Sequence, residues 1–259
     1  MRVRVFASGS KGNSLAVRSA SGCLLVVDLG LNYKHITARA AFCGVDIAEA
    51  KGVLFTHDHE DHYSALAVFH KRHPDIPLFA NVDTANAIAA KTGVHEGWVV
   101  FETAMSFDFE DFTITPFSIS HDAADPVGYL IENDGRALFI GTDTGVVTCG
   151  VRDAFARCDC AVLEANHDPV LLETSNRPVS LKQRIAGRSG HLTNEDSAEL
   201  FRSVNPLRLK NLLLAHLSEE CNSSSLARST MQQALEDCGR SDVVLTILSQ
   251  HEPSPLIEF

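Results

Sequence analysis

Short apolar runs separated by turn-forming residues divide the chain into many elements. Residues 2–7 alternate between polar and apolar side chains, which is the pattern of a half-buried strand. Apolar runs bounded by turn signals predict further strands at 15–17, 23–28, 53–56, 78–80, 98–101, 112–119, 127–132, 136–141, 161–164, 211–215 and 243–248. Apolar residues at helical spacing predict helices at 33–42, 64–70, 84–91, 181–185, 195–204 and 231–238.

Local signals fix two element boundaries. Ser64 precedes an apolar helical pattern, so we expect its side chain to cap a helix. Asp134 and Gly135 lie between two strand patterns, and an Asp-Gly pair supplies the positive φ that a two-residue hairpin turn needs.

The order of the elements predicts the fold class. Strands and helices do not alternate strictly, and the middle of the chain is dominated by strands. Two sheets packed together with helices on both outer faces would fit this order, which is a four-layer αββα sandwich of the α+β class. No Pro/Gly/Ser-rich linker or fixed-period repeat interrupts the chain, so we expect one domain over residues 1–259.

Composition narrows the class of protein. The chain is 45% hydrophobic and 21% charged, so it can build a large core. It shows neither a secretory signal nor the ~18 uncharged apolar residues of a membrane span, and we expect no membrane association. Its seven cysteines form no CxxC pair, which indicates reduced thiols and a cytoplasmic location.

The charge is acidic overall but locally basic. A net charge of −11 does not favour indiscriminate binding to nucleic acid. Residues 1–18 nevertheless carry four basic side chains and no acid, and residues 177–210 carry seven basic side chains against three acids. The basic side chains of these stretches could either form a rim that binds a phosphodiester substrate or lie on solvent-exposed faces, and charge alone does not decide between the two.

A cluster of histidines and acids follows the predicted strand at 53–56. The sequence HDHEDH contains His57, His59, Asp61 and His62, and these imidazole and carboxylate groups suit Zn, Mn or Fe. Alternate residues of a loop diverge, so His57 and His59 can bind one cation while Asp61 and His62 bind a second. The alternative is a surface loop that is rich in histidine, but clustering directly after a buried strand favours metal.

Three later residues would complete a two-metal site. His121, Asp143 and His216 each follow an apolar run, and one such residue alone is more often structural. Together they indicate strand ends that converge on one edge of the sandwich. We expect His121 to complete the first site, His216 the second, and Asp143 to bridge both cations.

These residues, in this order, resemble the metallo-β-lactamase superfamily. The resemblance covers nearly the whole chain and is closest to the YycJ (WalJ) branch. It is carried by the motifs VFASGSKGNS, VVDLGLN, THDHEDH, SHDAADPVGY, GTDTGVV, LEANHD, LKQRIAGRSGHLTN and LLLAHLSEECN. It implies an αββα fold, two divalent metal ions and DNA exonuclease activity. One departure is Arg177, which precedes Pro178 where the family pattern has an aromatic residue.

The expected chemistry uses the ligands and their neighbours. A hydroxide that bridges the two cations would be the nucleophile, and Asp61 would both ligate and orient it. Asp28 ends the strand at 23–28, and we expect it to hold a ligand imidazole in one tautomer, with a turn-initiating role as the alternative.

Further site residues are suggested by resemblance. His191 and Glu164 resemble a catalytic pair of the transfer-RNA 3′-processing nucleases on this fold, so Glu164 would keep His191 protonated as a general acid. The alternative places His191 at a helix N-terminus. His167 is expected beside the substrate because it lies close to Glu164, as does Asp168, to which we assign no step.

The glycine-rich segment at residues 8–14 is the last candidate. Ser10, Lys11 and Asn13 lie between two predicted strands, and main-chain N–H groups there could form a nest for a phosphate. A plain hairpin turn is the alternative.

Two enzymatic functions follow from these residues. The first is a di-metal phosphodiesterase acting as a 5′ to 3′ DNA exonuclease, with RNA as a second candidate substrate. No clamp for nucleic acid is visible in the sequence, so affinity must come from the core domain or from homo-oligomers. The second is a small-molecule hydrolase, namely a lactonase, thioesterase or cyclic phosphodiesterase, because one metal centre serves many substrates. A scaffold without activity would not need every ligand.

Overall fold

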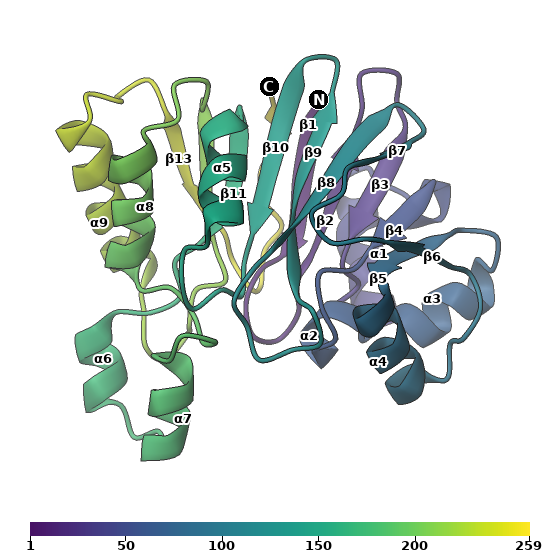
Figure 1. Cartoon of the computed structure of the whole chain (residues 1–259), viewed down its shortest axis with the longest axis horizontal. Coiled ribbons are helices and arrows are strands. Elements are labelled where there is room, and N and C mark those ends of the chain that lie inside the picture. Colours follow the sequence, from purple (N-terminus) through teal and green to yellow (C-terminus); the bar gives the residue numbers. More distant parts are fainter.

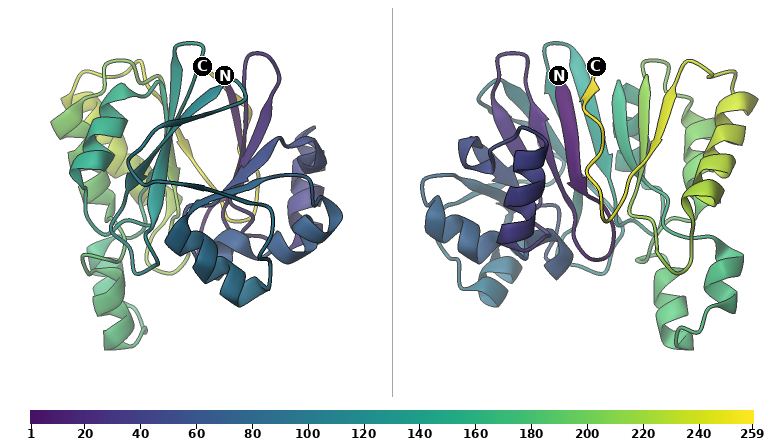
Figure 2. Two further views of the ribbon diagram at one scale, coloured as in Figure 1. Left: turned by 45° about the vertical axis from the view of Figure 1, so that its right-hand side comes forward. Right: turned by 180° about the vertical axis from the view of Figure 1, so that it is seen from behind.

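Two seven-stranded sheets pack face to face, with helices on both outer faces, in the computed structural model, which describes residues 1–259 (Figures 1 and 2). Sheet 1 has the order β14-β1-β2-β3-β4-β5-β6, formed by Ile257–Glu258, Arg2–Ala7, Ser14–Arg18, Leu24–Val27, Gly52–Leu54, Leu78–Asn81 and Trp98–Phe101. Sheet 2 has the order β13-β12-β11-β10-β9-β8-β7, formed by Val244–Ile247, Asn211–Ala215, Cys160–Glu164, Arg136–Gly141, Val127–Asn133, Phe112–Ser118 and Phe107–Phe109. The expected αββα sandwich is confirmed.

The helices fall into three groups. Sheet 1 is covered by α1 (Tyr33–Phe42), α3 (Leu66–Arg72) and α4 (Val82–Thr92), with the short α2 (Glu60–Tyr63) at its edge. Sheet 2 is covered by α5 (Cys149–Arg157), α8 (Asn194–Val204) and α9 (Ser224–Asp237). The remaining pair, α6 (Pro169–Thr174) and α7 (Val179–Ile185), projects from the body as an arm (Figure 1).

Side-chain alternation along the strands builds three apolar layers. Val5 and Val162 point between the two sheets, into a core of 21 buried residues. The neighbouring Phe6 packs with the helices of sheet 1, and Leu163 packs with the helices of sheet 2. Because successive strand residues face opposite sides, strands buried on both faces read as continuous apolar runs.

The directions of the strands explain why polar residues gather at one edge of the sandwich. In each sheet, one half is antiparallel and the other half is parallel, from β3 to β6 and from β10 to β13. Parallel neighbours end at the same edge, so the residues that follow them are brought together.

Local predictions near the turns had mixed outcomes. The Asp134-Gly135 hairpin is confirmed, since both residues have positive φ and Asn133 pairs with Arg136. The cap at Ser64 is wrong: a helix already begins at Glu60, and the Ser64 hydroxyl instead donates to the Glu60 carbonyl at its C-terminal end. Helices α2, α5 and α6 and strands β7 and β14 were not predicted.

No helix combines the length and the apolar character that crossing a bilayer would require.

Candidate metal centre

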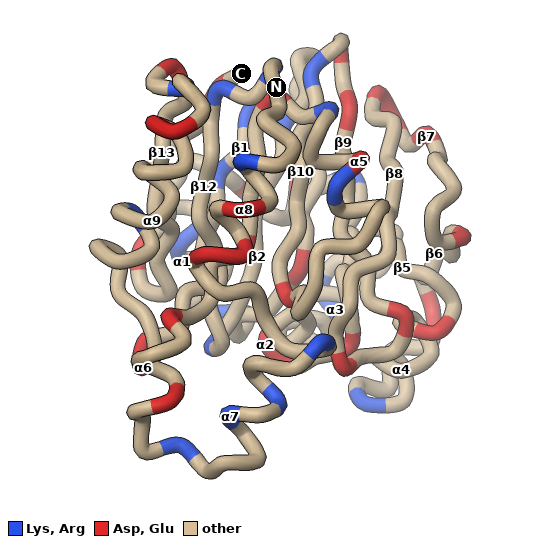
Figure 3. Tube along the Cα trace, turned by 60° about the vertical axis from the view of Figure 1, so that its left-hand side comes forward, with Lys and Arg blue, Asp and Glu red and all other residues tan.

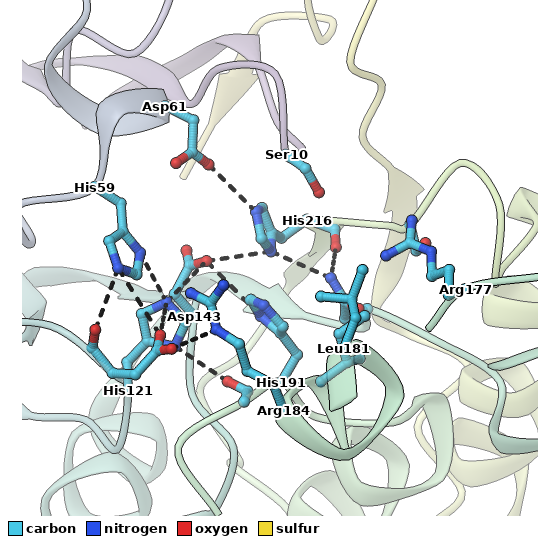
Figure 4. A pocket seen from close by; sticks show the side chains of 15 residues that line it. Ser10, His59, Asp61, His121, Asp143, Arg177, Leu181, Arg184, His191 and His216 are labelled. Atoms are coloured by element: carbon cyan, nitrogen blue, oxygen red, sulfur yellow. Dashed lines mark hydrogen bonds and ion pairs between the residues drawn. The ribbon is translucent and has the colours of Figure 1, made fainter. Parts of the chain in front are cut away.

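The predicted ligands meet at one edge of the sandwich, where strands of both sheets end (Figure 4). From sheet 1, β4 runs into the loop and short helix that carry residues 57–62. From sheet 2, His121 follows β8, Asp143 follows β10 and His216 follows β12. The site therefore depends on both sheets.

Three residues at this edge adopt left-handed backbone conformations. Asp28, Asp143 and His216 have φ values of 59°, 58° and 55°, and each lies just beyond the end of a strand. Such conformations are uncommon outside glycine and cost about 1–3 kcal/mol each. The same backbone turn at three strand ends indicates that the fold is shaped here to place side chains.

The donor atoms form two adjacent groups. One ligand atom from each residue lies within 4.8 Å of the others in the set His57, His59 and His121, and again in the set Asp61, His62 and His216. The carboxylate of Asp143 lies between the two sets, with Oδ2 3.4 Å from His62 Nε2 and Oδ1 3.9 Å from His121 Nε2. The structure thus brings the seven predicted ligands together, but the sets overlap, since His62 also groups with His57 and Asp143.

Each of the five imidazoles is held from outside through one ring nitrogen. His62 Nδ1 lies 2.7 Å from Asp28 Oδ2, and His216 Nδ1 lies 3.1 Å from Glu164 Oε1. The other contacts are those of His57 Nδ1 with Thr56 Oγ1 (3.0 Å), His59 Nε2 with the Asp122 carbonyl (3.2 Å) and His121 Nδ1 with the Gly190 carbonyl (3.2 Å). This leaves the second nitrogen of each ring for the centre of the site, as in protein metal sites.

Asp28 makes the contact expected from sequence. Besides His62, its carboxylate accepts hydrogen bonds from the Thr56 N–H and the Thr56 hydroxyl, both at 2.9 Å. It therefore links the end of β3 to the start of the segment at residues 57–62, which carries four of the predicted ligands and is called the ligand loop below.

Several atoms at the centre have no protein partner. His57 Nε2, His216 Nε2 and Asp143 Oδ2 are buried and form no hydrogen bond. Buried polar atoms are normally paired, and an unpaired one costs free energy. Imidazole nitrogens and carboxylate oxygens that face one another in this way fit divalent cations.

The protonation states of two of the histidines determine what a cation must displace when it binds. Burial, assisted by neighbouring His62, lowers the pKa of His57 well below its usual value, so this ring is neutral and offers a lone pair. Burial opposes charge at His216 as well, but attraction to Asp143, Asp61 and Glu164 raises the pKa of His216 to about 10. A cation that binds at His216 must therefore displace a proton.

A buried acid holds a further histidine beside the ligands. Glu164 ends β11, and its Oε1 accepts a hydrogen bond from His191 Nδ1 at 2.8 Å. Its Oε2 accepts from the N–H groups of Thr144 (2.9 Å) and Leu192 (3.2 Å). Burial alone would raise the pKa of Glu164, but attraction and hydrogen bonding to His191, together with the bond to His216, lower it to about 2. Ionised Glu164 thus fixes the His191 ring and leaves its Nε2 free.

The ligands open into a polar cavity of about 230 Å³. Only two of its fifteen lining residues are hydrophobic, namely Leu181 and Ile185. Ser10, one of the predicted substrate contacts, is part of the wall. The cavity therefore suits a polar substrate.

The other predicted substrate contacts lie off the cavity wall. Lys11 is exposed and forms an ion pair with Glu219. The Asn13 amide donates to Asp61 Oδ2 at 3.2 Å, so it contacts a ligand. His167 is buried, and its Nδ1 has no partner.

Asp168 caps α6 through its carboxylate, which accepts hydrogen bonds from the N–H groups of Val170 and Leu171. This contact gives Asp168 a structural place rather than a catalytic one.

Sequence reasoning missed several residues of the cavity wall, including Asp122, Asn166, Arg177, Arg184 and Ser218. The basic stretch at 177–210 was a signal for the arginines, but charge alone did not distinguish a cavity wall from a solvated face.

Comparison with known proteins agrees with this geometry. The profile of the Beta-lactamase superfamily domain matches residues 30–216. The exodeoxyribonuclease YycJ of Bacillus anthracis is 36% identical over 91% of this chain and 89% of its own. The exodeoxyribonuclease WalJ of Streptococcus pneumoniae is 35% identical over the same shares. The metallo-β-lactamase fold protein YhfI of Bacillus subtilis superimposes with a TM-score of 0.71 at 15% identity, over 98% of this chain and 99% of its own.

Sequence, fold and clustered ligands lead to one assignment. The chain belongs to the metallo-β-lactamase superfamily of metal-dependent hydrolases, in its YycJ (WalJ) branch.

Proposed function

We propose that the protein is a di-metal phosphodiesterase that acts as a DNA exonuclease and degrades strands from 5′ to 3′. One observation carries the proposal. Seven ligands from two sheets surround a shared centre, and the Glu164–His191 pair lies directly beside them. The names of the curated relatives support DNA as the substrate.

The wall of the cavity favours a phosphodiester over an apolar small molecule. Two guanidinium groups, of Arg177 and Arg184, line the cavity together with the ligands, and hydrophobic residues are scarce. Lactones and thioesters with acyl chains are bound by apolar surfaces, whereas arginine matches the oxygens of the phosphates along a nucleic-acid strand. The small-molecule hydrolase remains the alternative that the experiment below tests.

The residues have separable roles in this reaction. Two divalent cations, when bound, neutralise the phosphate and activate the attacking water. His57, His59 and His121 would hold one, Asp61, His62 and His216 the other, with Asp143 shared between them. Asp61 also lines the cavity, where its carboxylate orients the attacking water.

His191 supplies the proton for the leaving oxygen. Its Nδ1–H donates to Glu164, so Nε2 is the nitrogen from which a proton can be transferred. His191 also lines the cavity, where a substrate oxygen would come within its reach.

A substrate panel tests the function. Protein loaded with Zn or Mn is offered end-labelled duplex DNA, RNA and a set of lactones and thioesters. We expect mononucleotides to be released from DNA, beginning at the 5′ end. Asp143→Ala should abolish this release, because it removes the carboxylate between the two ligand groups, whereas the surface variant Asp75→Ala should leave it unchanged. Turnover of lactones or thioesters without release of nucleotides would contradict the proposal.

We also propose the identity of the metal, the domain organisation, the cellular location and the oligomeric state of the protein. Zn or Mn is the expected metal, with Fe as a third candidate, and the nitrogen and oxygen donor set supports all three. The return of β14 to sheet 1 supports a single domain over residues 1–259. Seven unpaired cysteines fit a cytoplasmic location. Assembly as a homo-oligomer and action on RNA are further proposals.

A further inference from the structure

Two arginines of the arm face the metal-ligand cluster across the cavity. Arg177 lies in the connection between α6 and α7, and Arg184 lies in the last turn of α7. Both line the cavity that also contains His59, Asp143 and His216 (Figure 4). Figure 3 shows the basic positions along this arm, which in the sequence also include Lys182 and Arg188.

Each arginine is anchored in the same way. Arg177 Nε donates to Glu220 Oε2 at 3.0 Å, and Arg184 Nε donates to Asp122 Oδ2. No hydrogen bond is formed by the terminal amino groups of either side chain. One edge of each guanidinium is thus held in place, and the two terminal amino groups stay available as a planar fork.

The anchors are themselves fixed to the site. The Asp122 carboxylate lies 3.6 Å from His121 Nε2 and 3.8 Å from His59 Nε2, so Arg184 is tied to the ligand cluster. The arm packs on the loop that carries Glu220 through a small cluster of Leu172, Ile185 and Cys221. The two forks are therefore presented by a packed element.

A guanidinium fork matches the paired oxygens of a phosphate. Two forks in the wall of this cavity exceed what the single phosphodiester proposed to react at its centre needs. We propose that Arg177 and Arg184 form a second phosphate-binding subsite, which engages a phosphate next to the one that is cleaved. The substrate of this site is then a strand with consecutive phosphates, rather than an isolated diester or a cyclic nucleotide.

This inference rests on the proposed phosphodiesterase function, and two substrates separate the two claims. Bis(4-nitrophenyl) phosphate offers one phosphate, and a 5′-phosphorylated oligodeoxynucleotide offers several. We expect Arg177→Gln and Arg184→Gln each to raise KM for the oligonucleotide about tenfold, roughly 1.4 kcal/mol, and to change kcat/KM for the single diester less than about twofold.

The arm supplies a matched control. Arg188 is exposed, lies beyond α7 and is not part of the cavity wall. Arg188→Gln removes the same charge from the same region, so it should change neither substrate's kinetics. Thermal unfolding of all three variants should match that of the wild type, since neither cavity arginine is buried.

A binding measurement reports on the subsite without catalysis. Fluorescence anisotropy of a labelled phosphorothioate oligonucleotide on metal-free protein should give weaker binding for Arg177→Gln and Arg184→Gln than for Arg188→Gln. The slope of log K against log salt should fall by about one for each cavity arginine removed.

The outcomes are distinct. Equal losses on both substrates, or losses in Arg188→Gln as large as in the cavity variants, would overturn the second subsite. So would unchanged oligonucleotide binding in both cavity variants. If the wild type hydrolyses neither substrate, the proposed function fails, while anisotropy still decides whether the subsite exists.

Discussion

The orientation of the individual histidine rings suits this site to binding cations. Each ligand histidine has one nitrogen bonded to a group outside the cluster and the other directed inward. The sequence could predict that these seven side chains would meet because they lie in a recognisable spacing after apolar runs. It also pointed to Asp28. It could not predict the carbonyls of Asp122 and Gly190 as anchors, since main-chain contacts have no sequence signature.

Metal loading should release protons. Attraction to nearby carboxylates overcomes burial and raises the pKa of His62 well above its usual value and that of His216 to about 10, so both rings are charged at pH 7 without metal. Ligation requires neutral rings, so binding expels protons, and affinity for Zn should fall as the pH is lowered.

Isothermal titration of metal-free protein with Zn measures this release at pH 7. The observed enthalpy should depend on the ionisation enthalpy of the buffer. A control with His95→Ala, an exposed histidine away from the site, should behave like the wild type. An enthalpy that is the same in every buffer would show that no proton is displaced.

The role of His191 can be separated from binding by the leaving group. His191→Ala should lower kcat on a DNA phosphodiester by about 10²–10⁴-fold, because the leaving alkoxide loses its proton donor. On bis(4-nitrophenyl) phosphate, whose leaving group needs no proton, the loss should be small. Initial rates on both substrates give the comparison, and equal losses would remove His191 from proton transfer.

The secondary-structure elements that build the site are the ends of strands and the turns that follow them. Apolar runs predicted most strands because both sheets are buried on two faces. They missed α5, in which only Val151, Ala154 and Phe155 are buried, so the helical pattern is brief. The left-handed turns at Asp143 and His216 had no signal at all, because neither residue type requires positive φ.

Gly30 allows the segment that follows β3 to approach the main chain of Asp61 and Asn13 closely. A Cβ on Gly30 would lie 1.6 Å from the Asp61 carbonyl oxygen and 2.6 Å from the Asn13 nitrogen, and neither main-chain atom can yield easily. Gly30→Ala should therefore destabilise the fold by at least about 1–3 kcal/mol and displace the loop that carries Asp61.

Urea unfolding and metal analysis would record both effects of Gly30→Ala. Gly150→Ala is the matched control, since the nearest atom to its new Cβ is a side-chain carbon at 3.3 Å and the residue is helical. Native stability with full metal content in Gly30→Ala would refute the close approach.

At the scale of the molecule, the docking of two sheets creates the site. Sheet 1 supplies the ligand loop, sheet 2 supplies the other three ligands, and the buried Tyr129 hydroxyl of β9 donates to the Phe55 carbonyl just before that loop. The order of elements predicted the αββα layers. It could not predict that the arm of α6 and α7 would form a cavity wall, because its charges read equally well as solvated surface.

The presence of two cations between the sheets is the central claim, and anomalous diffraction from crystals of the Zn-loaded protein tests it directly. We expect two peaks, one in contact with His57, His59 and His121 and the other with Asp61, His62 and His216, with Asp143 reaching both. A single peak, or peaks away from these side chains, would contradict it.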